Sequence, residues 1–433
     1  MREEEKGIGT KVLLVGLDTG EEEDFDHSME ELKSLAEAAG KEVAGIITQR
    51  MGTVNNAFYI GTGKVEEAGE YAIECGAEEV IFDNTLTPSQ IRNLGRELKL
   101  PVLDRTNLIL DIFALRARTR EAKLQVETAR LQYILPRLVG MRENLSRQGG
   151  AASGGGMGMS NKGAGETKLE LDRRKIEHRI SELRKELEDV SRIRETMRKK
   201  RSRSRIPQVA LVGYTNAGKS TILNHMLARY GENREKTVLE QDMLFATLDT
   251  NVRCIRPEGG SADNRPFFLA DTVGFIDKLP HGLVKAFRST LEEVRCADLI
   301  VHVVDFSDEH YKQQMEVTEQ TLGELEAGDI PRIVVYNKAD KGSMEPLPRV
   351  RGRQIYMAAS LDQGIEELAD MIVECVYADR VVREVVFPYD KGNLVSYFME
   401  NATVLEQEYR EDGIRMKVSC HKSDADKYCE YCG

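Results

Sequence analysis

A glycine-rich run at residues 213–220 constrains this chain more than any other feature. It reads Gly-Tyr-Thr-Asn-Ala-Gly-Lys-Ser, follows the apolar run 209–212, and precedes an amphipathic stretch through Leu227. That order of strand, loop and helix is the context that a phosphate-binding loop requires. Its glycines let backbone N–H groups curl around phosphate oxygens, and the helix N-terminus adds a positive dipole. The run predicts a nucleotide site in an α/β domain.

The chemistry of this site predicts specific roles for side chains along the chain. Lys219 is expected to reach the β and γ phosphates, and Ser220 to bind Mg²⁺. After the apolar run 266–270 comes Asp-Thr-Val-Gly, in which Asp271 could hold Mg²⁺ through water and the Gly274 N–H could meet the γ-phosphate. Thr247 lies between the two motifs and is expected to complete the Mg²⁺ shell, with an exposed strand threonine as the alternative.

The choice of base is predicted from residues 337–340, Asn-Lys-Ala-Asp, which follow the apolar run 333–336. An ionised Asp340 accepts hydrogen bonds from guanine N1–H and the 2-amino group, whereas adenine would leave the carboxylate unsatisfied. Lys338 is expected along the base or sugar, and Asn337 is expected to brace the loop. Backbone N–H groups of residues 358–360 are expected to supply the remaining guanine contact. The motif therefore indicates a guanine nucleotide.

The predicted site residues fall in five short segments. Lys219, Thr247 and Gly274 are the predicted catalytic residues, and Ser220, Thr247 and Asp271 the predicted metal ligands. The predicted nucleotide-binding residues are Gly213, Tyr214, Thr215, Asn216, Ala217, Gly218, Lys219, Ser220, Thr221, Phe245, Ala246, Thr247, Leu248, Asp249, Asp271, Thr272, Val273, Gly274, Asn337, Lys338, Ala339, Asp340, Ala358, Ala359 and Ser360.

The N-terminal part, residues 1–111, is predicted to be a small α/β domain with a parallel sheet. Strands are expected at 12–16, 43–47, 79–82 and 101–104, with helices at 29–39, 64–75 and 88–98 between them. Alternation of strand and helix at this spacing favours a parallel sheet. The Gly-Thr-Gly-Lys turn at 61–64 is interpreted as a strand-to-helix turn, with phosphate binding as the alternative.

Residues 112–206 are predicted to form a basic helical hairpin and a linker. Leu124, Leu131, Leu138 and Leu145 recur every seven residues, and a second apolar seam runs from Ile176 to Met197. Such spacings are typical of packed helices. Residues 146–165 between them are too glycine-rich for a helix and predict a flexible tip, and Pro136 predicts a kink.

Charge is segregated along the chain, whose net charge is -12. Residues 114–206 carry 24 Lys and Arg against 12 Asp and Glu, so the rest of the chain is strongly acidic. This pattern indicates either a polyanion binder or a solvated helix face. RNA fits such an arm, because an A-form surface is recognised mainly through phosphates and shape.

Residues 207–380 are assigned to the nucleotide-binding domain, and residues 381–433 to a small α+β domain with strands at 385–387 and 414–418 and a helix at 394–401. Seven cysteines without a regular pattern are typical of thiols kept reduced. Cys420, Cys429 and Cys432 are interpreted as loose cysteines rather than a zinc site. The sequence has no apolar run long enough for a membrane helix. Its first segment is acidic, so the chain is expected in the cytoplasm.

The chain resembles the HflX family of ribosome-associated GTPases over nearly its whole length. The segments that carry the resemblance, besides the nucleotide motifs, are residues 59–64, 104–106, 111–113, 116–120, 123–125, 135–138, 145–147 and 165–167. The chain departs from the family pattern at 151–162 in the tip, at Ala358, where serine is usual, and at 250–251, where Pro-Thr is usual. The resemblance implies a GTPase that binds the large ribosomal subunit, dissociates or rescues stalled ribosomes under stress, and reaches the peptidyl-transferase region with its hairpin.

Two other functions remain open at this point. The first is an ATP-dependent, helicase-like RNA-remodelling protein acting through the N-terminal domain, and the second is a GTPase partner in an RNA-modification complex. Phe275 stands where many relatives carry a water-orienting glutamine, so slow hydrolysis stimulated by ribosomes is expected. Asn216 either braces the loop or helps to hold K⁺. A monomer off the ribosome is expected.

Overall fold

The computed structural model describes residues 9–20, 24–138, 162–203, 206–231, 245, 251–257, 265–278, 288–342, 345–378, 380–410 and 413–431. The chain divides into two compact units. One comprises Met1–Glu188 with Lys278–Ala286, and the other comprises Asp189–Asp277 with Phe287–Gly433. Within the described stretches, none of the helices has the length and apolar character that crossing a membrane needs.

A four-stranded parallel sheet forms the centre of the first unit, with the strand order β2-β1-β3-β4. The strands are β1 (Lys11–Asp18), β2 (Glu42–Arg50), β3 (Glu79–Phe82) and β4 (Val102–Asp104). The sequence predicted all four, with ends displaced by at most three residues. Six consecutive residues of β1 are buried, as expected for a strand covered on both faces of a parallel sheet.

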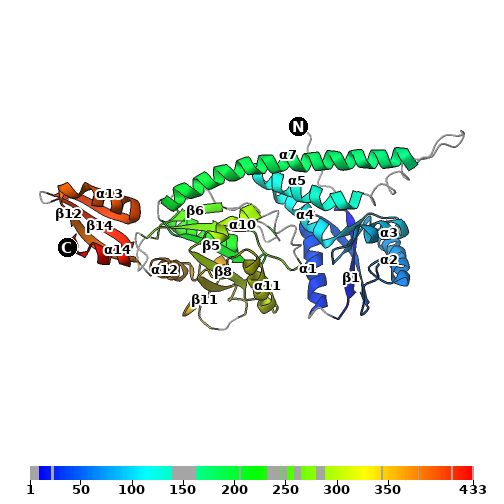
Figure 1. The fold of residues 1–433 in the computed structure, drawn as a ribbon. Helices are drawn as coiled ribbons and strands as arrows, with labels where there is room; N and C mark the ends of the chain where they lie inside the picture. Colours follow the sequence, from blue (N-terminus) through cyan, green and yellow to red (C-terminus); the bar gives the residue numbers. More distant parts are fainter. Residues whose placement is uncertain are drawn as a thin grey trace, which may run out of the picture. The chain divides into compact units, whose positions relative to one another are not determined.

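Helices cover both faces of this sheet (Figure 1). They are α1 (Phe25–Ala38) on one face and α2 (Thr62–Cys75) and α3 (Pro88–Leu98) on the other. Val65 of α2 and Leu94 of α3 pack on Leu13 and Phe82 in one core. Local sequence sets the helix ends: α2 stops at Gly76, which has φ 68°, and α3 begins with a capping box between Thr87 and Gln90.

Two further helices, α4 (Arg105–Arg116) and α5 (Arg120–Ile134), follow the sheet. The predicted domain boundary between residues 111 and 112 falls inside α4. Asp104 caps this helix by accepting a hydrogen bond from the Asn107 N–H, and Phe113 is still buried. The helix therefore continues to Arg116, and the break comes where Thr119 caps α5.

The predicted helical hairpin is present. It pairs α5 with α7 (Lys162–Arg203), and Figure 1 shows the two running side by side. Arg120 bonds Glu186 at 2.8 Å, whereas Glu127, seven residues further along α5, bonds Arg179, seven residues earlier on α7. Because the contacts move forward along α5 and backward along α7, the two helices are antiparallel. Leu183 of the predicted seam is buried.

The ends of the hairpin differ in detail from the prediction. The 3-10 turn η1 (Leu135–Arg137) contains Pro136 and ends α5, as the expected kink required. The predicted non-helical tip extended to residue 165, but α7 already begins at Lys162. The cost of Gly163 and Gly165, about 1 kcal/mol each, is small against propagation of a 42-residue helix. Residues 139–161, with Leu145 and most of the tip, lie outside the described residues.

A seven-stranded sheet forms the centre of the second unit, in the order β10-β11-β9-β8-β5-β7-β6. The strands β11, β9, β8, β5 and β7 are parallel, and β10 and β6 are antiparallel to their neighbours. The strands are β5 (Gln208–Gly213), β6 (Asn251–Ile255), β7 (Phe267–Asp271), β8 (Leu299–Asp305), β9 (Arg332–Asn337), β10 (Arg349–Arg351) and β11 (Gln354–Tyr356). The apolar runs predicted at 209–212, 266–270 and 333–336 lie in β5, β7 and β9.

The helical segments around this sheet are α8 (Lys219–Tyr230), α10 (Arg288–Arg295), α11 (Tyr311–Glu324), η3 (Ala359–Leu361) and α12 (Ile365–Val376). Ile222 of α8 and Ile372 of α12 share one core with Leu211, Val301 and Val335 of the strands. This core holds the carboxyl ends of β5, β7 and β9 in place, where the predicted nucleotide motifs begin.

The C-terminal part is a three-stranded antiparallel sheet with β14 at its centre. Its elements are β12 (Arg380–Phe387), η4 (Tyr389–Lys391), α13 (Gly392–Asn401), β13 (Thr403–Arg410), β14 (Gly413–His421), α14 (Lys422–Lys427) and η5 (Cys429–Tyr431). Sequence reasoning missed β13, because Glu406 and Glu408 interrupt its apolar pattern. Cys420 is buried in this sheet and Cys429 is exposed, whereas Cys432 lies outside the described residues. No cluster of three or more His, Cys, Asp and Glu side chains arranged to hold a metal ion occurs in the described part of the chain.

Candidate nucleotide site

The loop at 213–220 connects β5 to α8 and requires glycine at both ends. Gly213 has φ 147°, and a Cβ there would lie 2.1 Å from the Val303 carbonyl oxygen. Gly218 has φ 97°, and a Cβ there would lie 2.1 Å from Asn337 Nδ2. Neither approach is open to a larger residue. Asn216, with φ 60°, provides a further left-handed residue in the loop.

Lys219 is the first residue of α8, and its ammonium lies over the loop. Its Nζ donates to the carbonyl oxygens of Gly213, at 3.0 Å, and Tyr214, at 2.7 Å. Burial lowers the pKa of Lys219 to about 8, although the nearby Asp271 carboxylate opposes this shift. The lysine is therefore a buried cation held by backbone dipoles, beside the N-terminus of a helix.

Ser220 and Asp271 come from separate motifs and meet in this site. Asp271 ends β7, which pairs with β5, and its Oδ2 accepts a hydrogen bond from Ser220 Oγ at 2.8 Å. The adjacent Thr272 hydroxyl donates to the Leu211 carbonyl oxygen at 2.6 Å, which fixes the strand end. Two oxygen donors of the kind that Mg²⁺ prefers are thus brought together.

Gly274 lies against the glycine-rich loop. A Cβ at this position would be 2.9 Å from Thr215 and 3.2 Å from Lys219 Nζ, so the close approach depends on glycine. Its neighbour Phe275 pairs with the loop through the backbone, donating to Gly213 and accepting from Thr215. The Phe275 side chain is only 2% exposed. The ring is packed in the interior and offers no hydrogen bond to a water molecule.

The segment 337–340 follows β9 and is joined to the loop by Asn337. The Asn337 Nδ2 donates to the Ala217 carbonyl oxygen at 2.9 Å, and its Oδ1 accepts from the Ala359 N–H at 3.0 Å. This is the bracing that the sequence predicted for Asn337. Asp340 is exposed and Ala339 is buried. Ala358 and Ala359 are fully buried, and Ser360 is exposed.

Three contacts in this site were not foreseen. Lys338 Nζ bonds Asp305 Oδ2 at 2.7 Å, which holds a lysine with φ 57°. The Tyr214 hydroxyl accepts a hydrogen bond from the Asp277 N–H at 2.8 Å. Asn337 also borders Gly218. Asp305 ends β8 beside β9 and was detectable as a polar residue after an apolar strand, but the tyrosine contact has no sequence signal.

Two predicted parts of the site have different outcomes. Phe245 is described and buried, whereas Ala246, Thr247, Leu248 and Asp249 lie outside the described residues. The turn at 61–64 in the first unit has a structural explanation, because the Gly61 N–H donates to Gln49 Oε1 at 2.8 Å and Lys64 pairs with Glu67. That pairing is the strand-to-helix turn that the sequence favoured.

Family models match three consecutive stretches of the chain. They describe the N-terminal region of a GTP-binding GTPase, over residues 26–114, its middle region, over residues 116–201, and a 50S ribosome-binding GTPase, over residues 208–338. Together they span the strands β2, β3 and β4 of the N-terminal sheet, the described part of the hairpin, and the second unit from β5 through Lys338.

Curated relatives match over almost the full length. GTPase HflX of Caldanaerobacter subterraneus subsp. tengcongensis is 43% identical over 413 residues, 95% of this chain and 91% of the relative. GTPase HflX of Escherichia coli strain K12 is 38% identical over 412 residues, 94% and 92% of the two chains. A solved GTP-binding protein from Sulfolobus solfataricus in complex with GDP is 24% identical, with a TM-score of 0.42 over 85% of this chain and 99% of that one. The sequence identity to the curated relatives, on a chain that carries the phosphate-binding loop, shows that this protein is a GTPase belonging to the HflX family.

Proposed function

We propose that this GTPase binds the large ribosomal subunit and dissociates or rescues stalled ribosomes, acting in the cytoplasm under stress and as a monomer off the ribosome. The observation that carries the proposal is the antiparallel basic hairpin on the same chain as a complete phosphate-binding loop. The family model over residues 208–338 describes a 50S ribosome-binding GTPase, which supports the same partner.

Within the site, we assign the phosphate chemistry to Lys219, Ser220, Asp271, Gly274 and Thr247. The Lys219 ammonium exchanges its two carbonyl partners for the β and γ phosphates, and the Gly274 N–H donates to the γ-phosphate. Ser220 and Asp271, whose oxygens lie 2.8 Å apart, fit an Mg²⁺ ion, with Thr247 completing the shell. The ion neutralises charge on the phosphates when bound.

Guanine selectivity is assigned to Asp340. Its carboxylate accepts from N1–H and the 2-amino group, while Asn337 keeps the base-binding and phosphate-binding loops in register. A site that requires such hydrogen bonds rejects a base lacking them by about 10⁴-fold. Lys338, held by Asp305, lies along the base or sugar, and N–H groups of residues 358–360 complete the recognition.

Intrinsic hydrolysis is proposed to be slow and stimulated by ribosomes. The residue after Gly274 is a buried phenylalanine, which cannot orient an attacking water. A group supplied on the ribosome, or a K⁺ ion held with the help of Asn216, then stabilises the charge that develops on the phosphates. Asn216 has a left-handed backbone, so its alternative role is to brace the loop.

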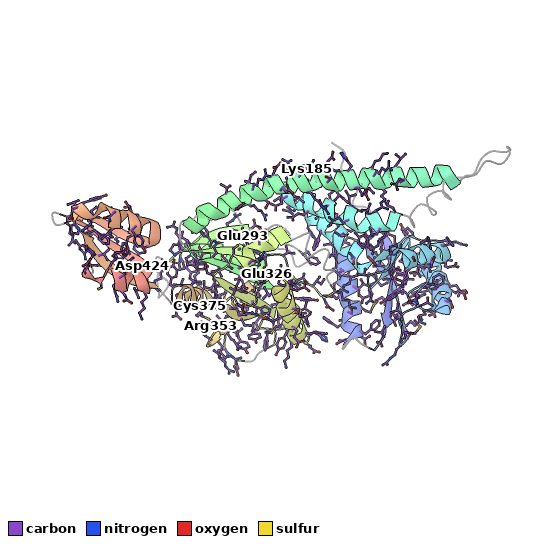
Figure 2. The ribbon with its side chains drawn as sticks, viewed as in Figure 1. Lys185, Glu293, Glu326, Arg353, Cys375 and Asp424 are labelled. Atoms are coloured by element: carbon purple, nitrogen blue, oxygen red, sulfur yellow. The ribbon has the colours of Figure 1, made fainter. Side chains whose placement is uncertain are left out.

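The hairpin is proposed to supply affinity for ribosomal RNA through residues 114–206. Lys185 of α7, labelled in Figure 2, is exposed, and Arg173 and Arg174 lie on the same helix as i,i+4 partners of Glu177 and Glu170. Exposed ion pairs of this kind contribute little to stability, so they can be exchanged for RNA phosphates at little cost.

Cosedimentation with ribosomes tests this function against its two alternatives. The full chain is mixed with ribosomes and GTP, a non-hydrolysable GTP analogue, GDP or ATP, and subunits are separated by density. We expect the analogue to retain the protein on the large subunit and GTP to increase free subunits. Remodelling that requires ATP would favour the helicase-like alternative, and the absence of binding in every nucleotide state would favour a modification partner.

A further inference from the structure

A groove lies between α2 and α3, which pack against each other on one face of the N-terminal sheet (Figure 1). Its volume is about 410 Å³, within the range of about 300–1,000 Å³ that is typical of ligand-binding pockets. Val65 of α2 and Leu98 of α3, both buried, contribute to its apolar lining. We call this feature, which also includes Gly69 and Ile73, the α2–α3 groove. All its lining residues belong to the first compact unit.

Ile73 extends the apolar lining of the groove into solvent. Val65, Gly69 and Ile73 follow one another at four-residue spacing on α2, so they form one stripe along the helix. Val65 is buried, whereas Ile73 is 83% exposed. A single exposed apolar side chain is ordinary, but this one continues a buried apolar lining at its open rim. Such a surface is typical of a groove that a second apolar segment covers.

Gly69 lies in the middle of α2, where glycine is less favourable than alanine. The packing of α2 on α3 does not require it, because a Cβ at this position would lie 3.6 Å from Leu98 Cδ2, an ordinary contact distance. The missing side chain instead keeps the groove open halfway along its length. The sequence thus gives up helix stability at the position where an occupant would approach α2 most closely.

The groove also carries unbalanced negative charge. Glu66 and Glu70 line it from α2, and Glu97 lines it from α3. Among the described residues, Lys99 is the one cation in the lining, and none forms an ion pair with these three carboxylates. Like charges four residues apart, such as Glu66 and Glu70, destabilise a helix, and α2 has no basic residue in its last turn to offset them. A cationic ligand would relieve this repulsion.

We propose that the α2–α3 groove is a docking site for a basic amphipathic helix of a partner protein. The apolar side of that helix covers Ile73 and the buried lining, as in other complexes in which a helix binds in a groove. Its Lys or Arg residues pair with the three glutamates. Carboxylates repel RNA phosphates, so this site differs in chemistry from the basic hairpin and takes a partner other than the ribosomal RNA proposed for it.

The first test uses the full chain without ribosomes or nucleotide, so its outcome is independent of the proposed ribosomal function. The probe is a fluorescent peptide of about 18 residues, or five helical turns, with leucines on one side and lysines on the other. We expect it to bind, and a peptide with glutamates in place of the lysines not to bind. Glu66→Gln/Glu70→Gln should weaken binding by about fivefold. The matched control Glu30→Gln/Glu37→Gln, at exposed positions of α1, should leave the affinity unchanged.

A second pair of variants separates docking in the groove from attraction by charge alone. Gly69→Met fills the groove and Ile73→Asn removes its apolar rim, so each should weaken binding of the lysine peptide by about tenfold. Leu115→Asn, at a 65% exposed position of α4, is the control and should bind normally. Thermal unfolding should show a higher melting temperature for Gly69→Met than for the parent, because a helical glycine is lost.

Two outcomes overturn the proposal. The first is that the parent chain binds neither peptide. The second is that Gly69→Met and Ile73→Asn bind as the parent does while only Glu66→Gln/Glu70→Gln binds more weakly, since the groove is then a solvated acidic surface. Because Ile73 is exposed, Ile73→Asn decides the question even if Gly69→Met does not fold.

Discussion

In each of the two larger sheets of this protein, polar residues follow the carboxyl ends of the parallel strands, but their roles differ. In the larger sheet, the carboxyl end of β5 continues into a loop whose glycines bring the backbone against Val303 and Asn337. In the N-terminal sheet, both carboxylate oxygens of Asp104 at the end of β4 are hydrogen-bonded within the protein, because they accept from the N–H groups of Leu86 and Asn107. The first edge carries the phosphate-binding motif, whereas Asp104 at the second edge is satisfied by backbone N–H groups of the protein itself.

This difference shows that activity resides in the loops and not in the fold. The N-terminal sheet is parallel, and the larger sheet has five parallel strands between two antiparallel edge strands. Each sheet is followed by a turn with a Gly-x-Gly or Gly-Lys sequence. The turn at 61–64 is contacted by Gln49, while Lys219 bonds two backbone carbonyls that a phosphate can replace. Replacing side chains at one edge while leaving the other unchanged therefore shows at which edge hydrolysis takes place.

The largest effect is expected from Lys219→Ala, which should abolish most of the GTP hydrolysis at the edge of the larger sheet. Loss of the ammonium removes charge stabilisation from the γ-phosphate, and hydrolysis should fall by about 10³-fold. Phosphate release by the purified chain measures it. The matched control, Lys64→Ala in the N-terminal turn, should retain full turnover. Normal turnover in Lys219→Ala would remove this residue from the site.

The next effect concerns the choice of base. Asp340→Asn replaces one acceptor by a donor, which opposes the guanine 2-amino group and suits the xanthine C2 carbonyl. We expect GTP affinity to fall by about 10²-fold while XTP affinity rises. Competition binding with GTP, XTP and ATP measures the preference, with Asp329→Asn as an exposed control. An unchanged preference for GTP would show that another residue recognises the base.

Ribosome binding should depend on the basic hairpin of the N-terminal unit. Reversing the charges of Arg173, Arg174 and Lys175 to glutamate should weaken ribosome binding by about tenfold and reduce its salt dependence, because phosphate contacts are lost. Intrinsic hydrolysis should be nearly unchanged. Deleting residues 149–165 should preserve binding and abolish subunit separation. Equal affinity of the charge-reversed and parent chains at two salt concentrations would identify the arm as a solvated helix.

Nucleotide affinity measured over a range of pH tests the protonation of Lys219, which lies at the edge of the larger sheet. Its pKa is lowered to about 8 in the free protein by burial, and phosphate charge raises it again on binding. Binding should therefore take up a proton near pH 8, and affinity should fall as pH rises from 8 to 9 by up to about tenfold. Titration calorimetry in buffers of different ionisation enthalpy measures the uptake. Identical heats and a flat affinity would show that the lysine stays charged in both states.

The smallest effect is expected from monovalent cations. If Asn216 helps to hold K⁺, replacing KCl by NaCl at equal concentration should slow turnover by several fold, both with and without ribosomes. Asn216→Asp tests the alternative that this residue only braces the loop, since a carboxylate preserves an oxygen ligand. Rapid turnover in NaCl without ribosomes would contradict both the K⁺ role and the expectation of slow intrinsic hydrolysis.

The nucleotide motifs can be located from the sequence, because each begins at the end of an apolar strand. Gly213, Gly218 and Asn337 are identifiable for that reason, and their required contacts are present. Prediction was weaker where tertiary packing decides. The end of α4 depends on burial of Phe113, and β13 forms because β14 accepts it as a partner despite its charges. Lys278 bonds Asp83 and Ser28, which are 195 and 250 positions away in the sequence, and no local pattern encodes such contacts.

The position of Asn337 affects how the site binds the two halves of a nucleotide. One side chain donates to Ala217, in the loop to which we assign the phosphates, and accepts from Ala359, in the segment to which we assign the base. Guanosine and pyrophosphate, offered as separate fragments, are therefore not independent ligands, since either one orders a loop that the other needs. The intact nucleotide gains more affinity than the two halves added together, and Asn337 makes the site respond to the whole molecule.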